Sequence, residues 1–198
     1  QRIGEGHQDQ YINVFKGEYK KESARNYEFE NVIYIIGIHG NAFNAPSMLK
    51  FLYREAVKFL RSEQSKTVDK IVVLAPDYPG SAASGGRFAT IQELAIDSMV
   101  LLVRDLVNKG VDPSQIICLG HSLGGTVLVE ADHQLLQKNI VTTIVSINSF
   151  SQIQRHANDS SIIGKVFLGQ YNIKASNYFQ DHPKHRRFVE HTQDDPVI

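Results

Sequence analysis

The stretch Gly120-His121-Ser122-Leu123-Gly124-Gly125 decides the fold of this chain. The mostly apolar run 115–119 leads into it, and the run 126–131, which contains one glutamate, follows it. A serine between glycines at a strand-to-helix junction is typical of a nucleophile elbow, because glycine lets the backbone turn sharply and pass close to its neighbours. The short pattern alone could also be a glycine-rich turn with a solvated serine. The flanking strand and helix favour Ser122 as a catalytic nucleophile.

Strand and helix patterns alternate outward from this turn, which predicts an α/β domain with a mostly parallel sheet. β-Branched residues without polar alternation indicate strands that are buried on both faces. Two short strands near the start of the chain could form an antiparallel pair at the sheet edge. The expected strands are 11–15, 27–30, 31–38, 71–74, 115–119, 140–147 and 186–190.

Besides the helix that follows Ser122, two more helices are expected between these strands. The first is 46–61, where Pro46 suits the first turn and Met48, Leu52, Ala56, Phe59 and Leu60 share one face. The second runs from a capping box at 90–93 to about Lys109, with Gly110 as the stop. We expect one domain over 1–198. The irregular, partly aromatic segment 149–185 is a candidate lid over Ser122.

The composition restricts the class of partner. Lys and Arg number 21, as do Asp and Glu, so the net charge is zero with neutral histidines, and nothing in this balance points to nucleic acid or an anionic membrane surface. The basic cluster 184–187 is interpreted as a solvated face. No window of the sequence is long and apolar enough to span a bilayer.

Cys118 is the single cysteine, so no internal disulfide can form. It lies in the strand before Ser122, where we expect a buried, inert thiol. A single cysteine without a signal-like segment suits a reducing, cytoplasmic compartment. The chain begins at Gln1 rather than methionine, so we expect it to be processed or cut from something longer.

Attack by a serine hydroxyl requires a base and preorganised donors for the oxyanion. His39-Gly40-Asn41-Ala42 ends a central strand directly before a helix, and the Asn41 N–H is our first candidate donor. The Leu123 N–H, at a helix N-terminus, is the second. His39-Gly40 could also be only a strand-to-helix turn. Asp77, in the loop Asp77-Tyr78-Pro79-Gly80, is interpreted as a turn-forming residue rather than a catalytic acid.

The order of these motifs resembles the α/β-hydrolase superfamily, from about Asn31 onward. The Asp77-Tyr78-Pro79-Gly80 loop, followed by Ser84-Gly85-Gly86, is most similar to the monoacylglycerol-lipase and lysophospholipase-like esterase branches. The resemblance implies an α/β-hydrolase fold and a Ser-Asp-His triad in that chain order. It implies Asp195 as the acid, just before a proline and valine, with Asp194 as the alternative. Both could instead belong to a solvated acidic turn.

The chain departs from the family where the catalytic histidine is expected. That histidine follows the acid after one more strand, whereas this sequence ends at Ile198, so the last strand and helix of the fold are also expected to be missing. The sequence could be truncated, another histidine could substitute, or the protein could be a non-catalytic relative. His39 and His121 are expected to be structural, and His133 lies far along the helix after the elbow. His156, His182 and His185 could approach Ser122 only if the candidate lid folds over it.

These residues predict a serine hydrolase that cleaves carboxylic esters through an acyl-enzyme on Ser122. A small-molecule lipid or acyl ester is the favoured substrate, because of the branch resemblance and the apolar residues of the candidate lid. These apolar residues could equally pack the lid on the core. No cofactor is expected, and no metal-ligand spacing is found. The alternative is a binding module of the same fold that lacks the catalytic histidine.

Overall fold

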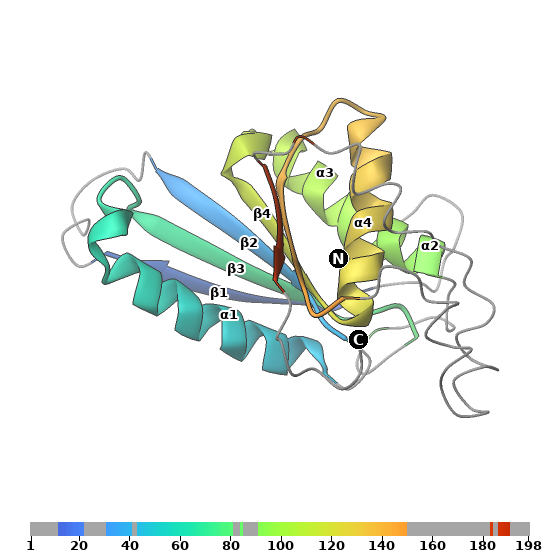
Figure 1. The fold of residues 1–198 in the computed structure, drawn as a ribbon, viewed down its shortest axis with the longest axis horizontal. Helices are drawn as coiled ribbons and strands as arrows, with labels where there is room; N and C mark the ends of the chain where they lie inside the picture. Colours follow the sequence, from blue (N-terminus) through green and yellow to red (C-terminus); the bar gives the residue numbers. More distant parts are fainter. Residues whose placement is uncertain are drawn as a thin grey trace.

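The protein is organised around a six-stranded sheet (Figure 1). A computed structural model describes residues 12–21, 31–40, 43–80, 84, 91–149, 183 and 186–190. The strand order is β1-β3-β2-β4-β5-β6, in which β2 to β6 run parallel and β1 runs antiparallel to β3. The strands are β1 (Val14–Lys20), β2 (Val32–Ile38), β3 (Lys70–Pro76), β4 (Ile116–His121), β5 (Thr143–Ile147) and β6 (Arg187–Glu190).

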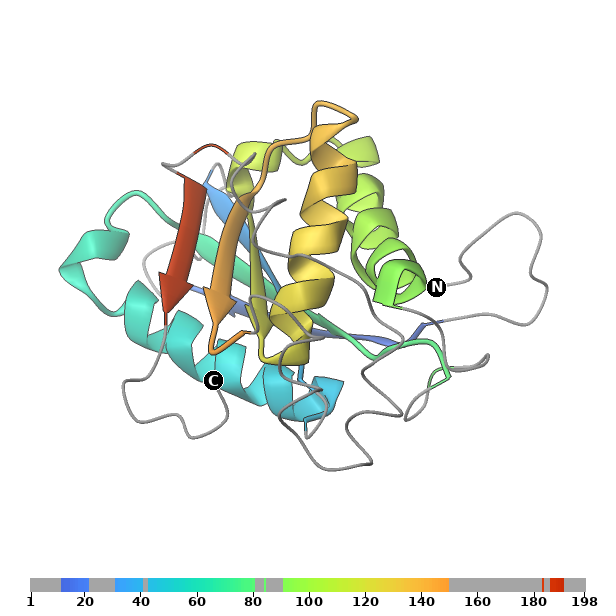
Figure 2. The ribbon, with the colours of Figure 1, turned by 45° about the vertical axis from the view of Figure 1, so that its right-hand side comes forward.

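Helices cover both faces of this sheet (Figures 1 and 2). Helix α1 (Ala45–Leu60) packs on one face, and α2 (Ile91–Ala95), α3 (Leu101–Asn108) and α4 (Leu123–Leu136) pack on the other. Successive side chains of a strand point to opposite faces, so Ile36 joins the core under α4 while Ile35 packs against the core under α1. The predicted fold class, a mostly parallel sheet flanked by helices, is confirmed.

Helix α1 lies close to the sheet because β2 carries a glycine beneath it. A Cβ on Gly37 would lie 2.8 Å from Met48 Cγ and would overlap Leu52 Cδ1. The helix begins where the Asn44 side chain accepts the Ser47 N–H at 3.0 Å. The predicted apolar face is buried except at Phe59, which is 37% exposed because its side chain leaves the stripe that contacts the sheet.

Two elements differ from the sequence-based expectation. The predicted helix 90–109 consists of α2, a π-helical segment Ile96–Val100 and α3, and it ends before Gly110 at φ 88°. The predicted first strand is shifted to Val14–Lys20 because β1 pairs along β3, from Val14 opposite Pro76 to Lys20 opposite Lys70. β1 is an antiparallel edge strand as expected, but its partner is β3. Its predicted partner, 27–30, lies outside the described residues.

The parallel strands β2, β3, β4 and β5 all have their carboxyl ends on the same side of the sheet. The candidate site lies in the loops on this side. Loops at the carboxyl ends of parallel strands are where open α/β sheets bind ligands. The residues that follow these strands are His39-Gly40, Asp77-Tyr78, Ser122 and Asn148-Ser149. Apart from Ser149 and Pro183, the candidate lid 149–185 lies outside the described residues. Among the helices that the structure describes, none has the length and apolar character to cross a membrane.

Candidate active site

Ser122 occupies the sharp turn between β4 and α4. Its backbone has φ 54° and ψ −122°, a conformation that side chains of L-residues rarely adopt. Its N–H donates to the Ile147 carbonyl at 3.0 Å, and its own carbonyl accepts the Gly125 N–H at 3.0 Å. The strand, turn and helix that the sequence predicts around Ser122 are therefore present, and the surrounding hydrogen bonds hold the strained backbone in place.

Glycines surround Ser122 because the elbow is closely packed. A Cβ on Gly120 would lie 2.5 Å from the Gly124 carbonyl oxygen, so β4 and α4 could not meet as closely with any other residue there. A Cβ on Gly124 would overlap the carbonyl of Ile38, at the end of β2. One on Gly125 would overlap Ser149 after β5. The glycines that suggest an elbow in the sequence are thus required by two close backbone approaches, at Gly120 and Gly124, and by the packing of the Ser149 side chain against Gly125.

The sequence predicts two oxyanion donors, the N–H groups of Leu123 and Asn41. Leu123 is the first residue of α4, and the first N–H groups of a helix have no intrahelical partner. Gly40 lies on the opposite side of the turn, where a Cβ would be 2.9 Å from Ser122 Cβ and 3.1 Å from the His121 carbonyl oxygen. Asn41, the other predicted donor, lies outside the described residues. Gly40, the residue before it in the sequence, contacts the serine.

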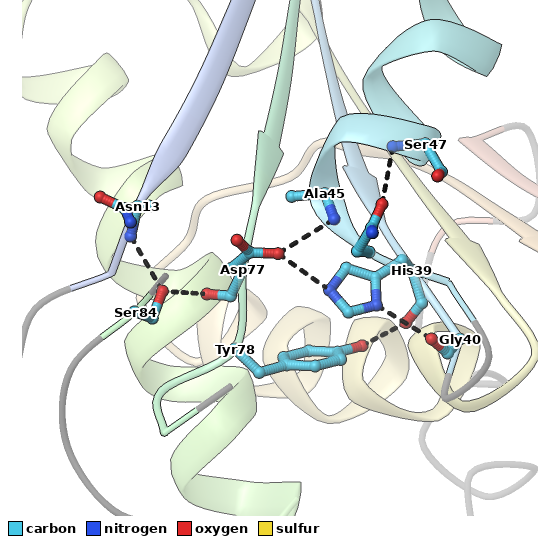
Figure 3. Close-up of polar contacts among 9 residues, drawn as sticks. Asn13, His39, Gly40, Ala45, Ser47, Asp77, Tyr78 and Ser84 are labelled. Atoms are coloured by element: carbon cyan, nitrogen blue, oxygen red, sulfur yellow. Dashed lines mark hydrogen bonds and ion pairs between the residues drawn. The ribbon is translucent and has the colours of Figure 1, made fainter. Parts of the chain in front are cut away.

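His39 and Asp77 form a buried contact beside this turn (Figure 3). His39 Nδ1 lies 2.9 Å from the Gly40 carbonyl oxygen, and His39 Nε2 lies 3.7 Å from Asp77 Oδ1. The same carboxylate oxygen accepts the Ala45 N–H at 3.0 Å, at the start of α1. Asp77, which the sequence predicts to be a turn-forming residue, precedes the turn at 79–80, and its carboxylate also connects the ends of β2 and β3 to α1. One pattern in the sequence indicates this contact: each of the two residues directly follows a buried strand.

Tyr78 closes the other side of His39. Its hydroxyl donates to the His39 carbonyl, and the two ring centroids are 4.5 Å apart. The hydroxyl is fully enclosed, and this burial raises the pKa of Tyr78 far above its ordinary value. Tyr78 therefore acts as a neutral hydrogen-bond donor, and nothing in its surroundings favours a phenolate.

The other residues weighed in the sequence analysis are partly within and partly outside the described residues. The His121 ring lies edge-to-face against Phe43, with centroids 5.6 Å apart, and His133 lies along α4, 3.0 Å from the Gln137 amide nitrogen. Neither contact involves Ser122. The predicted acid Asp195 and its alternative Asp194 lie outside the described part of the chain, as do His156, His182 and His185.

Cys118 lies within β4, four residues before Ser122, and is fully buried. Burial raises the pKa of its thiol to about 12. The thiolate is the reactive form of cysteine, so this side chain is chemically inert at neutral pH, as expected. Within the described ranges, no group of three or more His, Cys, Asp or Glu side chains is arranged to hold a metal ion.

Comparison with known proteins agrees with this geometry. The sequence profile described as "Alpha/beta hydrolase family" matches residues 35–191. No curated protein sequence matches the chain. Among solved structures, an alpha-beta hydrolase from Vibrio vulnificus has a TM-score of 0.57 at 17% identity, covering 83% of this chain and 57% of that one.

Two further structures show that the same fold accommodates different compounds. Est1E from Butyrivibrio proteoclasticus, solved with ferulic acid, has a TM-score of 0.51 at 18% identity, covering 84% of this chain and 58% of that one. A formylmaleamic acid deformylase from Pseudomonas putida has a TM-score of 0.54 at 11% identity, covering 96% of this chain and 83% of that one. The chain thus spans less than three fifths of the Vibrio hydrolase and of Est1E.

Proposed function

The chain belongs to the alpha/beta hydrolase family, and from this premise we propose that it is a serine hydrolase that cleaves carboxylic esters through an acyl-enzyme on Ser122. One observation carries the proposal: Ser122 has a positive φ at the strand-to-helix turn of a family member. This conformation directs a side chain out of the turn, away from both the strand and the helix. A merely solvated serine would not require a strained backbone.

The proposed reaction has two halves. The Ser122 hydroxyl attacks the ester carbonyl while a histidine base takes its proton, and the resulting oxyanion accepts hydrogen bonds from the N–H groups of Asn41 and Leu123. The base then protonates the leaving alkoxide, so that an alcohol departs and the acyl group remains on Ser122. Water, activated by the same base, releases the acid. Asp195 orients the histidine base.

A lipid or other acyl ester is the substrate class that we favour. The support is the Asp77-Tyr78-Pro79-Gly80 loop, which resembles those of lipase-like branches, and the apolar residues of the candidate lid, 149–185. The structural neighbours do not decide between substrates, since they include a protein bound to ferulic acid and a deformylase. The fold supports hydrolysis in general, and the acyl chain has to be identified by assay.

The decisive experiment is labelling of the intact protein with a fluorophosphonate probe. An activated serine forms an Oγ–P bond and releases fluoride, so we expect labelling of the wild type and none of Ser122→Ala. Ser47→Ala is the matched control, because Ser47 is an exposed serine in the first turn of α1, and it should label fully. Asp195→Asn should lower kcat on p-nitrophenyl acyl esters by about 10³-fold or more, as loss of a triad carboxylate does.

The outcomes separate the two candidate functions. An intact, folded protein that resists the probe and cleaves no ester would overturn the hydrolase proposal. The non-catalytic binding module would then be the better description. Labelling of the Ser122→Ala variant would show that another residue is the nucleophile. An unchanged kcat in Asp195→Asn, with a large loss in Asp194→Asn, would exchange the two acids while leaving the proposed reaction intact.

A further inference from the structure

We infer that His39 and Asp77 are positioning residues, which fix the Gly40 backbone beside Ser122, where the oxyanion of the proposed reaction would form. The inference rests on the proposed hydrolase function and assigns a role to two buried side chains that the proposed triad does not use. His39 is 4% exposed and Asp77 is 1% exposed. Neither side chain is placed to meet a substrate directly, so their effect has to pass through the backbone that they hold.

The first step is the contact between Gly40 and the proposed nucleophile. A Cβ on Gly40 would come within 2.9 Å of Ser122 Cβ, so the Gly40 backbone lies directly against the serine. The Gly40 carbonyl also accepts the Phe43 N–H at 3.2 Å, which closes the turn. A small rotation of the Gly40 peptide would therefore displace backbone atoms that lie against Ser122.

The second step is the hydrogen bond from His39 to the Gly40 carbonyl. The carbonyl oxygen can only accept, so Nδ1, 2.9 Å away, carries the hydrogen. A peptide group is planar, so a contact that holds its carbonyl fixes the orientation of the whole group. The imidazole that holds the Gly40 carbonyl therefore fixes the orientation of the backbone in contact with Ser122.

The third step is the set of contacts that hold the imidazole. Asp77 Oδ1 faces Nε2 at 3.7 Å, and among the described residues Nε2 has no hydrogen-bond partner. Asp77 is itself fixed, because it accepts the Ala45 N–H and its own N–H donates to the Asn13 carbonyl at 2.9 Å. Tyr78 covers the imidazole from the other side (Figure 3). The ring thus lies between the Asp77 carboxylate and the Tyr78 ring in a buried environment, which leaves it little room to turn.

The chain allows a graded test on these two residues. His39→Ala removes the donor to Gly40. His39→Asn retains one, because the asparagine amide nitrogen is separated from Cβ by the same number of bonds as Nδ1. Asp77→Asn keeps the shape and an acceptor for Ala45 but removes the charge. Ser47→Ala remains the control outside the site.

The measurement is ester hydrolysis by the intact protein, with kcat expressed per active site titrated by the fluorophosphonate. A purely structural role would reduce the number of titrated sites and leave kcat per site unchanged. We expect His39→Ala to lower kcat per site by about 10²-fold, as expected for a lost oxyanion donor, with KM within about threefold of the wild type. His39→Asn should recover about tenfold of that loss, and Asp77→Asn should lower kcat about tenfold.

The results separate this inference from the function on which it rests. Wild-type kcat per site in His39→Ala, or in both His39→Asn and Asp77→Asn if the alanine variant does not fold, overturns the inference alone. So does a His39→Asn variant that is as slow as His39→Ala. An intact wild type that neither labels nor hydrolyses esters overturns the proposed function, and the inference falls with it.

Discussion

Ser122 combines a proposed chemical role with a strained backbone, and the strain can be measured separately. Ser122→Gly and Ser122→Ala both remove the hydroxyl, but only glycine adopts φ 54° without a steric clash. Such strain costs roughly 1–3 kcal/mol, and the greater freedom of glycine in the unfolded chain offsets roughly 0.5–1 kcal/mol of the gain. We therefore expect the glycine variant to be more stable than the alanine variant by about 1 kcal/mol in urea unfolding.

The comparison between these two variants needs no activity, so it tests the turn independently of the chemistry. Asn139 offers a control, since it also has a positive φ, 58°, in a turn away from the site. Asn139→Gly and Asn139→Ala should differ in the same direction. Equal free energies of unfolding for Ser122→Gly and Ser122→Ala would mean that the elbow is relaxed.

At the residue scale, local patterns predicted the turn but not the buried pair beside it. The geometry around Ser122 depends on glycines that are adjacent in sequence, so spacing alone suggested it. The contact of His39 with Asp77 depends on β2 and β3 being neighbours in the sheet, 38 residues apart along the chain. From its neighbours in the sequence, Asp77 is predicted only to form a turn, because aspartate is a common turn residue. Only the strand order shows that its carboxylate reaches α1 and the end of β2.

At the element scale, β1 is an edge strand held partly by charge. The pKa of Glu18 is lowered from 4.5 to about 2, first by a hydrogen bond from Lys16 on the same strand and then by one from Lys70 on β3. Because the folded-state pKa lies below the unfolded one, the stabilisation is fully present above about pH 4.5. It is lost as the pH falls from there toward 2. The Glu18 side chain is 35% exposed, so solvent screening limits the effect to about 1 kcal/mol or less.

Urea unfolding at a series of pH values checks this expectation. Glu18→Gln should be less stable than the wild type at pH 6, and the difference should shrink as the pH falls from 4.5 to 2. Glu63→Gln is the matched control, since it removes an exposed ion pair with Lys66 that joins no two strands. A Glu18→Gln difference that stays constant over this range, or equals that of Glu63→Gln, would contradict a role for the carboxylate in holding β1.

Elements with a strong local pattern were predicted within a few residues, and those shaped by distant contacts were not. The strand 31–38 and the helix 46–61 carry their own periodicity, and they match β2 and α1. The π-helical segment Ile96–Val100 has no such pattern, because the apolar stripe of 90–109 fits one continuous helix. β1 begins at Val14 rather than at the predicted residue 11, because pairing with β3 determines where the strand begins.

At the scale of the whole molecule, the candidate site depends on how the strands are ordered. His39, Asp77 and Ser122 follow three different strands, and they meet because β3, β2 and β4 are consecutive neighbours. Alternating strands and helices predicted a parallel sheet and therefore a shared carboxyl edge. The neighbour relations were not predicted from the residues, since every buried strand has a similar apolar composition. The order of the strands depends on tertiary packing between segments, which the pattern of one segment cannot indicate.

The same sheet separates two cores, and their energetics should be independent. Leu52 of α1 lies in the core on one face and Leu128 of α4 in the core on the other, and each is at most 2% exposed. We expect Leu52→Ala and Leu128→Ala each to lower the free energy of unfolding by about 2–5 kcal/mol. Their effects should add in the double variant within roughly 0.5 kcal/mol, because the sheet keeps the two cavities apart.

Additivity alone would also hold for two units that unfold separately, so the shape of the transition is the second readout. β2 and β3 supply side chains to both cores: Ile36 and Val72 belong to the core that contains Leu128, and Ile71 and Val73 to the core that contains Leu52. Loss of either core should therefore unfold the sheet as a whole, in a single urea transition with an unchanged m-value. If Leu52→Ala produced a second, earlier transition that Leu128→Ala did not, α1 would be melting while β4, β5 and α4 stayed folded. The shared strands would then not couple the two faces.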